Sequence, residues 1–271
     1  MRDNAARSHA SAAAGRGHGI YLRRLGLHHD GGRLRSHQNC PWNQAKASLP
    51  YAHRAFKGEA GGVPFFGWQW YWNNADTHTV LAYPNAACGA SPWGTMGSIG
   101  KTPGYPRTIG NIDIHSTFDI DIDTKPLKGH DVWDLAYDIW VLDEDCNPAD
   151  FGPGDIKGEI MVWLDARNFS VYGWLGKPLD TVTENGRLFD YWYYPDQADG
   201  NGRDGKHRYM AFVSRTPIHS SSDFDLSPYF AYLVDKGYLA ANDYLALVEL
   251  GTENVMGEGQ VIVKNYSVTV K

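Results

Sequence analysis

Long apolar runs are absent from this chain. No stretch of 18 consecutive apolar residues occurs in its 271 residues, so the sequence predicts no transmembrane helix. Residues 1–32 also lack the continuous apolar segment of a secretory signal peptide, because Arg, His and Gly interrupt each short apolar piece. We therefore expect no membrane association, and the sequence has no readable signal peptide.

Positive charge is scarce overall. The chain has 25 Lys and Arg against 31 Asp and Glu, a formal net charge of −6. This balance disfavours nucleic acid and anionic membranes as partners and is compatible with a neutral polysaccharide. Residues 1–36 are the exception, with seven Arg, two Asp and neither Lys nor Glu. We expect them to be a disordered or irregular leader, and a single domain to occupy residues 37–271.

Cysteine is also scarce, with three residues: Cys40, Cys88 and Cys146. An odd count leaves at least one of them unpaired within the chain. A bridge between Cys40 and Cys88 and three free thiols are both compatible with the sequence. No metal-ligand spacing of His or Cys, no phosphate-binding loop, no dinucleotide fingerprint and no G-x-S-x-G motif occurs. The sequence therefore predicts no metal site.

Aromatic residues and turn formers are abundant, with 10 Trp, 16 Tyr, 10 Phe, 30 Gly and 14 Pro. Apolar or alternating runs lie between clusters of Gly, Pro, Asn and Asp, which is typical of strands joined by turns. The predicted strands span residues 79–85, 109–123, 131–143, 158–166, 188–195, 207–215, 244–253 and 260–271. In the second of these, Asp119, Asp121 and Asp123 alternate with Ile, which indicates a strand with one solvated face and not a calcium loop.

One segment, residues 225–238, predicts a helix. Ser227 and Pro228 stand at its start, and Gly237 follows as a stop signal. Many strands with one helix predict an all-β fold, which we expect to be a jelly-roll sandwich of two antiparallel sheets with one α-helix.

The segment GEIMVWL at residues 158–164 is the most informative strand. Side chains alternate across a strand, so its aliphatic residues face one side and Glu159, Met161 and Trp163 face the other. A carboxylate, a thioether and an indole in line do not make an ordinary solvated face. They indicate the floor of a groove that binds a ligand both polar and flat.

Two further segments place acids on one face. DLAYDIW aligns Asp134 with Asp138, and ELGTE aligns Glu249 with Glu253. Glycoside cleavage uses two carboxyls across the scissile bond, and neighbouring charge and burial move their pKa values apart. Taken singly, an acid on an outer strand face is more often a solvated residue than a catalyst.

Three segments resemble, in this order, motifs of family 12 glycoside hydrolases, the small endo-β-1,4-glucanases. WDLAYDIW is similar to the family's A-Y-D strand, GEIMVWL to its E-x-M-[IV]-W-L strand, and ELGTENVMGEG to its G-T-E-P-F-x-G segment. The last strand, VKNYSVTVK, also resembles the family's, so the resemblance covers roughly residues 37–271. Three positions depart from the motifs: Cys40 stands in place of Asn, Val255 in place of Phe, and Asp134 where a neutral Asn is often found.

The resemblance implies roles for individual residues. Glu159 matches the catalytic nucleophile, Glu253 the acid/base, and Asp138 the carboxylate that sits beside the nucleophile and tunes it. Four further positions match residues that bind the sugar chain: Trp42, Trp70, Met161 and Trp163. Trp42 lies in NCPWN, similar to the family's N-x-W motif, and Trp70 lies in GWQWYWNN, similar to its W-Q-W stretch.

The resemblance implies an endo-β-1,4-glucanase that hydrolyses internal bonds of β-glucans with retention of anomeric configuration, by double displacement. No cofactor is implied, because this chemistry needs only carboxyls and water. The expected partner is a cellulose-type glucan, a mixed-linkage glucan or xyloglucan, and the expected location is extracellular. Two alternatives stay open: a xyloglucan-specific endoglucanase, and a non-catalytic carbohydrate-binding β-sandwich, which needs aromatics but no facing pair of carboxyls.

Overall fold

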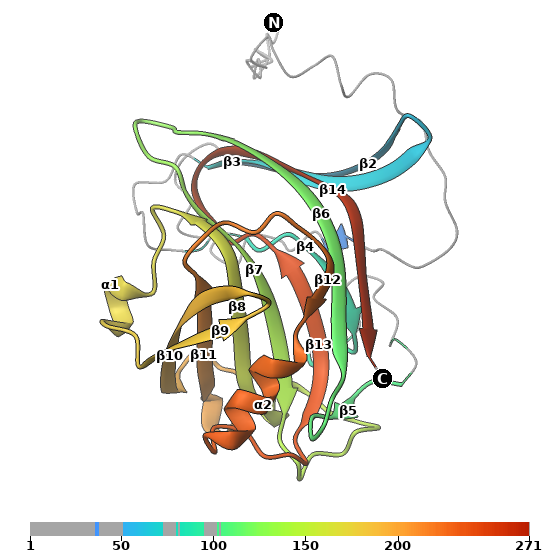
Figure 1. Ribbon diagram of the computed structural model, residues 1–271, viewed down its shortest axis with the longest axis vertical. Coiled ribbons are helices and arrows are strands. Elements are labelled where there is room, and N and C mark those ends of the chain that lie inside the picture. The colour runs from blue at the N-terminus through green and yellow to red at the C-terminus, as the bar shows by residue number, and fades with distance from the viewer. Residues whose placement is uncertain are drawn as a thin grey trace, which may run out of the picture.

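The computed structural model describes residues 36–37, 51–72, 80, 82–94, 102 and 104–270. Within these residues the chain forms two stacked sheets joined by one long strand, β14 (Figure 1). The first, sheet A, contains, in spatial order, β1 (Ser36–His37), β4 (Asn85–Gly89), β13 (Tyr244–Gly251), β7 (Val132–Leu142), β8 (Ile156–Arg167), β11 (His207–Ser214), β10 (Arg187–Gln197) and β9 (Asp180–Glu184), with β5 (Arg107–Thr108) paired to β13. The second, sheet B, contains β2 (Tyr51–Ala60), β3 (Val63–Trp72), β14 (Asn254–Val270), β6 (Ile114–Lys125) and β12 (Ser220–Asp225).

The predicted all-β sandwich is confirmed, with one difference in strand direction. Strands β8 and β11 are parallel neighbours, whereas the sequence led us to expect antiparallel sheets throughout. The chain leaves β8 through β9 and β10 and returns as β11, which inserts between β8 and β10. Strand β10 is antiparallel to both β9 and β11, so β9 and β11 run in the same direction. That direction is also the direction of β8.

Strand β14 belongs to both sheets. At its start, Asn254 and Met256 pair with β7 of sheet A, and from Gly257 onward it pairs with β3 and β6 of sheet B. The crossing falls at Gly257, whose φ of 120° is a conformation that other residues rarely adopt. A Cβ at this position would also lie 2.9 Å from Asp131 Oδ1. The glycine therefore allows the strand to turn from one layer into the other.

The core lies between the two sheets and is rich in aromatic side chains. Strand β3 contributes alternate residues Trp68, Trp70 and Trp72, all buried in the main core. Trp70 faces Gly259 on the neighbouring strand so closely that a Cβ there would lie 2.1 Å from its ring. The structure thus places Trp70 among the core side chains of sheet B, which differs from the expectation that it lines a sugar-binding groove.

The predicted helix is confirmed as α2 (Ser227–Asp235), which packs Tyr229, Phe230 and Leu233 into the core. Gly237 follows it with φ 73°, as a helix stop requires. A second short helix, α1 (Tyr172–Leu175), and two 3₁₀ turns, η2 (Pro153–Asp155) and η3 (Arg203–Gly205), were not predicted. No helix in the described part of the chain has the length and apolar character needed to span a bilayer.

Six strands of the described residues had no prediction from the sequence: β1, β2, β3, β5, β9 and β12. The strand predicted at residues 79–85 is wrong in position, since β4 begins at Asn85, where the prediction ended. The Pro84 that precedes it has no amide hydrogen for a ladder. In the described part of the chain Cys88 and Cys146 are free thiols, and Cys40, the partner considered for Cys88, lies outside the described residues.

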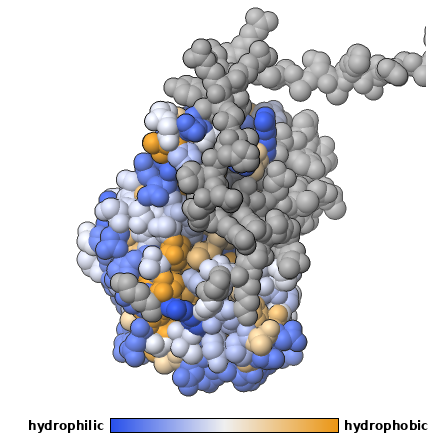
Figure 2. Space-filling view, turned by 90° about the vertical axis from the view of Figure 1, so that its right-hand side faces the viewer, coloured by the Kyte–Doolittle hydropathy of each residue, from blue (hydrophilic) through white to orange (hydrophobic). Residues whose placement is uncertain are grey.

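The solvent face of β6 carries the three alternating aspartates that the sequence assigned to a solvated strand. Lys264 of β14 lies 2.6 Å from Asp121 and 4.0 Å from Asp119, so a lysine ammonium balances these carboxylates. On the side of the molecule in Figure 2 the described residues are mostly hydrophilic, with apolar patches among them.

The leader can be tested by truncation. We expect a variant that begins at Ser36 to unfold at the temperature of the full chain, because it keeps β1 paired with β4 and removes residues with little apolar surface to bury. Thermal unfolding followed by circular dichroism measures this. A fall of more than about 4 °C would show that the leader supplies stabilising contacts.

Candidate active site

The outer face of sheet A, turned away from the core, gathers five carboxyls from three adjacent strands. The alternation predicted from the sequence is confirmed: Ile160, Val162 and Leu164 of β8 point into the main core, while Met161 and Trp163 lie in a separate cluster on the outer face. Strand register aligns the outer residues in rows. Glu249 of β13 stands opposite Asp138 of β7, which stands opposite Met161 of β8.

Backbone and side-chain hydrogen bonds fix Glu253 between β13 and β14. The Glu253 amide donates to Asp134 Oδ1 at 3.0 Å, and the Asp134 amide donates to the Glu253 carbonyl oxygen at 3.2 Å. This reciprocal pair holds Glu253, in the link between β13 and β14, against the first residues of β7. Asp134, one of the departures from the family motif, thus positions the predicted acid/base.

The five carboxyls differ in how far solvent can reach them. Asp134, Asp138 and Glu249 are buried, with 0%, 5% and 8% of their surface exposed. Glu159 and Glu253 are both partly exposed, and the Glu159 side chain retains 13%. The two residues that the sequence proposed as catalytic are therefore the two carboxyls of this set that a substrate can contact.

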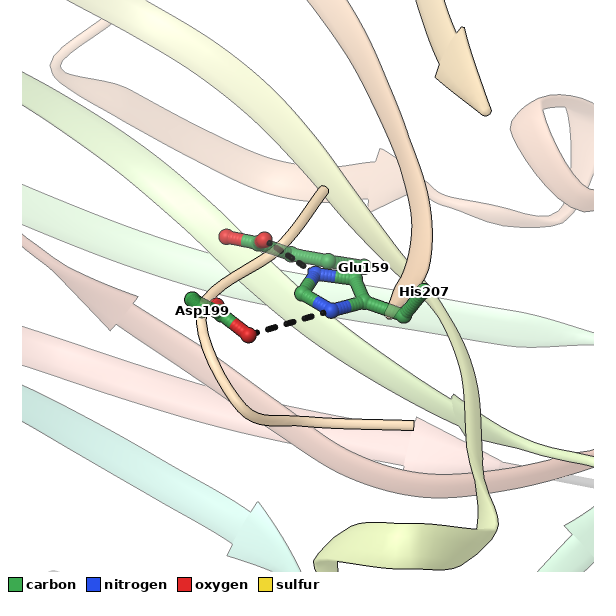
Figure 3. Close-up of side chains that lie close together, drawn as sticks. All are labelled: Glu159, Asp199 and His207. Atoms are coloured by element: carbon green, nitrogen blue, oxygen red, sulfur yellow. Dashed lines mark hydrogen bonds and ion pairs between the residues drawn. The ribbon is translucent and has the colours of Figure 1, made fainter. Parts of the chain in front are cut away.

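A histidine that the sequence did not reveal lies beside Glu159. His207, the first residue of β11, has a fully buried side chain whose Nε2 is 3.0 Å from Glu159 Oε2. Its Nδ1 lies 3.4 Å from Asp199 Oδ1, so the ring stands between two carboxylates (Figure 3). Nothing in the sequence pointed to it, because the contact depends on the parallel pairing of β11 with β8 and on the fold of a loop predicted only as polar.

The two partly exposed glutamates both lie among carboxyls and differ in that a histidine cation stands beside Glu159. Burial raises the pKa of Glu253 well above its usual value, and the neighbouring Asp134, Glu159 and Asp138 raise it further. Burial also raises the pKa of Glu159, but the hydrogen bond and charge of His207 act in the opposite direction. Burial lowers the pKa of His207, yet Asp199 and Glu159 outweigh it and raise that pKa to about 9, so the ring is a cation at neutral pH.

The three buried carboxyls hold protons more readily than free acids do. Burial is the leading cause in each case, raising the pKa of Asp134 and of Glu249 to about 7 and that of Asp138 well above its usual value. Glu249 also accepts a hydrogen bond from Trp140 Nε1 at 3.3 Å. Protonation of these groups limits the negative charge that gathers around Glu159 and Glu253.

Met161 and Trp163 lie next to the acids as predicted, but both are almost fully buried. Trp163 Nε1 and the Tyr209 hydroxyl both point at the Met161 sulfur, at 3.4 and 3.2 Å. Together with Trp192 they form an apolar layer beside Glu159. Val255, where the family motif has Phe, is buried in another small cluster with Val132 and Met256. Trp42 lies outside the described residues.

One group of residues has the types and spacing that could hold a metal ion: in the described ranges, Glu159, Asp199 and His207 bring their polar atoms within 4.8 Å of one another. The two ring nitrogens of His207 face opposite ways, each toward one carboxylate. In this geometry the imidazole ring forms one ion pair with each carboxylate. A coordination sphere would need the donor atoms to converge on one point.

Comparison with known families decides what this acidic cluster belongs to. The family model for glycosyl hydrolase family 12 matches residues 69–271. The chain belongs to glycosyl hydrolase family 12. It is therefore a glycoside hydrolase, and the motif resemblance read from the sequence is confirmed.

Individual proteins similar to this family 12 member are named as endoglucanases or xyloglucanases. Endoglucanase S of Pectobacterium parmentieri is 29% identical over 210 residues, which cover 76% of this chain and 71% of that protein. The xyloglucan-specific endo-beta-1,4-glucanase A of Aspergillus niger is 28% identical over 234 residues, 85% of this chain and 83% of the relative. The native family 12 xyloglucanase from Bacillus licheniformis superposes with a TM-score of 0.69 at 23% identity, covering 86% and 91% of the two chains, which shows the shared fold.

Proposed function

We propose that this chain is an endo-β-1,4-glucanase that retains anomeric configuration, with Glu159 as nucleophile and Glu253 as acid/base. The observation that carries the assignment of roles is the position of the His207 cation, which lies beside Glu159. His207 favours the ionised form of Glu159, whereas Glu253 has carboxyl neighbours that favour its protonated form. A nucleophile needs the first state and a proton donor the second.

In the proposed reaction Glu253 donates its proton to the glycosidic oxygen while the Glu159 carboxylate attacks the anomeric carbon. The leaving sugar departs as an alcohol, and the remaining sugar is esterified to Glu159. Glu253, now ionised, takes a proton from a water that attacks the anomeric carbon and releases Glu159. Asp138 lies buried one row from Glu159, where burial and the neighbouring carboxyls raise its pKa and so disfavour its charged form beside the nucleophile.

Two candidate functions differ in the glucan that the enzyme prefers: a general endo-β-1,4-glucanase and a xyloglucan-specific one. The relatives include an endoglucanase and several enzymes described as xyloglucan-specific, which supports a β-1,4-glucan backbone as the substrate class and keeps xyloglucan as the second candidate. A polymer of this kind is too large to enter a cell intact, so an extracellular place of action belongs to the same proposal.

Release of reducing ends from carboxymethylcellulose, mixed-linkage glucan, xyloglucan and xylan tests the proposal. We expect activity on the glucans and none on xylan, and NMR of the first product should show the β-anomer. A first product with the α-anomer would exclude double displacement. Binding of glucan without any release of reducing ends would favour the non-catalytic sandwich.

The role of His207 predicts a pH effect. His207→Gln keeps a hydrogen-bond donor but removes the cation, so the pKa of Glu159 should rise. Glu159 is then protonated at higher pH, and the acidic limb of kcat/KM should move upward by about one pH unit. The groups that face Glu159 and set the rest of the profile are Asp134, Asp138, Asp199, Tyr209, Glu249 and Glu253.

The matched control is His115→Gln, on β6 of sheet B, where the ring also contacts two carboxylates, Asp113 and Asp223. That histidine lies on the other sheet from the acids, so its replacement should leave the pH profile unchanged. A folded His207→Gln protein with an unmoved acidic limb would contradict the role given to His207.

A further inference from the structure

The residue row that contains Glu159 continues across sheet A toward its far edge. Trp140 of β7 pairs with Glu159 of β8, Glu159 with Tyr209 of β11, and Tyr209 with Tyr194 of β10. These side chains share the outer face, because their sequence neighbours point into the core. Neighbouring strands are about 4.8 Å apart, so Tyr194 stands about 10 Å from Glu159 along a line that crosses the strands.

At the end of this row stands an exposed tryptophan. Trp174, in α1, keeps 50% of its surface exposed, and Tyr194 keeps 39%. Among the side chains that the structure describes, these two are the exposed large aromatics, and they contact each other edge to face with ring centroids 6.0 Å apart. The Trp174 ring also lies 5.1 Å from that of Tyr209, the residue paired with Glu159.

The segment that carries Trp174 is fixed to the sheet on both sides. Val171 before it is buried in the outer-face cluster. Gly176 after it accepts a hydrogen bond from Trp192 Nε1 of β10 at 2.9 Å. The Leu175 amide closes the short turn by donating to the Val171 carbonyl at 2.8 Å. An indole exposed by half its surface is thus held in place, and binding a ligand would cost little extra ordering.

We propose that Trp174 and Tyr194 form a stacking subsite for one pyranose unit of the β-linked glucan chain, about two strand spacings from the nucleophile. The faces of a β-linked glucose unit carry axial C–H groups, which pack on aromatic rings, and its hydroxyls point outward to water. The position in the Glu159 row places this platform where a chain lying across the strands would extend from the reacting bond. The inference rests on the proposed function and adds a binding site to it.

Binding to an inactive variant tests the subsite without catalysis. In a Glu159→Gln background, titration calorimetry with cellohexaose gives Kd for the parent, for Trp174→Ala and for Trp174→Phe. We expect Trp174→Ala to weaken binding about 5- to 100-fold, as the loss of a large aromatic contact does. Trp174→Phe should stay within a few-fold of the parent, since it keeps a flat apolar face.

The matched control is Leu188→Ala, which removes an exposed apolar side chain from the same face of the same strand, about 20 Å from Tyr194. It should bind cellohexaose as the parent does. Equal binding by the parent and Trp174→Ala would overturn the platform while leaving the proposed function intact, and so would an equal loss in Trp174→Phe and Trp174→Ala. If the parent variant binds no cellohexaose, the substrate class is wrong and the platform falls with it.

Discussion

Glu159→Ala is expected to lower turnover on glucan by about 10⁴-fold or more, because no glycosyl-enzyme can form without the carboxylate. The fold should survive, since the side chain lies partly exposed on the outer face of β8 beside His207. Reducing-sugar release measures the loss, and circular dichroism measures the fold. Added azide should restore part of the activity by attacking the side of the sugar that the missing carboxylate leaves open. Its product would have inverted configuration.

Glu258→Ala is the control for this experiment, because it removes an exposed glutamate of β14 on sheet B. It should hydrolyse glucan at the rate of the unaltered chain. Hydrolysis at that rate by Glu159→Ala would show that the nucleophile is another residue, and the motif comparison would then have misplaced the reaction centre.

Glu253→Ala should lose about 10²- to 10⁴-fold on glucans, the usual contribution of a general acid, but far less on aryl glycosides with a good leaving group. Such substrates need little protonation in the first step, so the glycosyl-enzyme on Glu159 still forms and then accumulates for lack of a base. Stopped-flow release of the aryl alcohol should show a burst followed by slow turnover.

Azide distinguishes this variant from the first. It should attack the glycosyl-enzyme of Glu253→Ala and give a glycosyl azide with net retention, the opposite outcome to that of Glu159→Ala. Equal losses on glucan and on activated substrates, or an azide product of inverted configuration, would contradict the acid/base role of Glu253.

Much of this site could be predicted because it depends on local alternation. A strand period of two residues assigns Glu159, Met161 and Trp163 to one face whatever the rest of the fold does. The order of three short motifs then identified the family, and the family model confirms it. The helix at Ser227–Asp235 was equally accessible, since its start and stop residues and its apolar face are adjacent in sequence.

What the sequence could not supply depends on contacts between distant strands. His207 reaches Glu159 over 48 residues of sequence, through a parallel pairing that no local pattern encodes. Trp70 was misplaced for a related reason. Alternation predicts that Trp68, Trp70 and Trp72 share a face, but only the assembled sandwich decides that this face is the interior. The platform at Trp174 was also invisible, because a four-residue helix has no periodicity to recognise.

The passage of β14 from one sheet to the other has a consequence for how sequence change reaches the chemistry. The strand begins at the residue after Glu253 and then runs through the middle of sheet B, hydrogen-bonded to β3 and β6. Sheet B therefore helps to fix the position of the proton donor Glu253 and also forms one wall of the core. A substitution that shifts β14 in that sheet can move the donor relative to the nucleophile without touching sugar or acid. Divergence among relatives in sheet B would thus adjust the reaction from the layer opposite the acidic cluster.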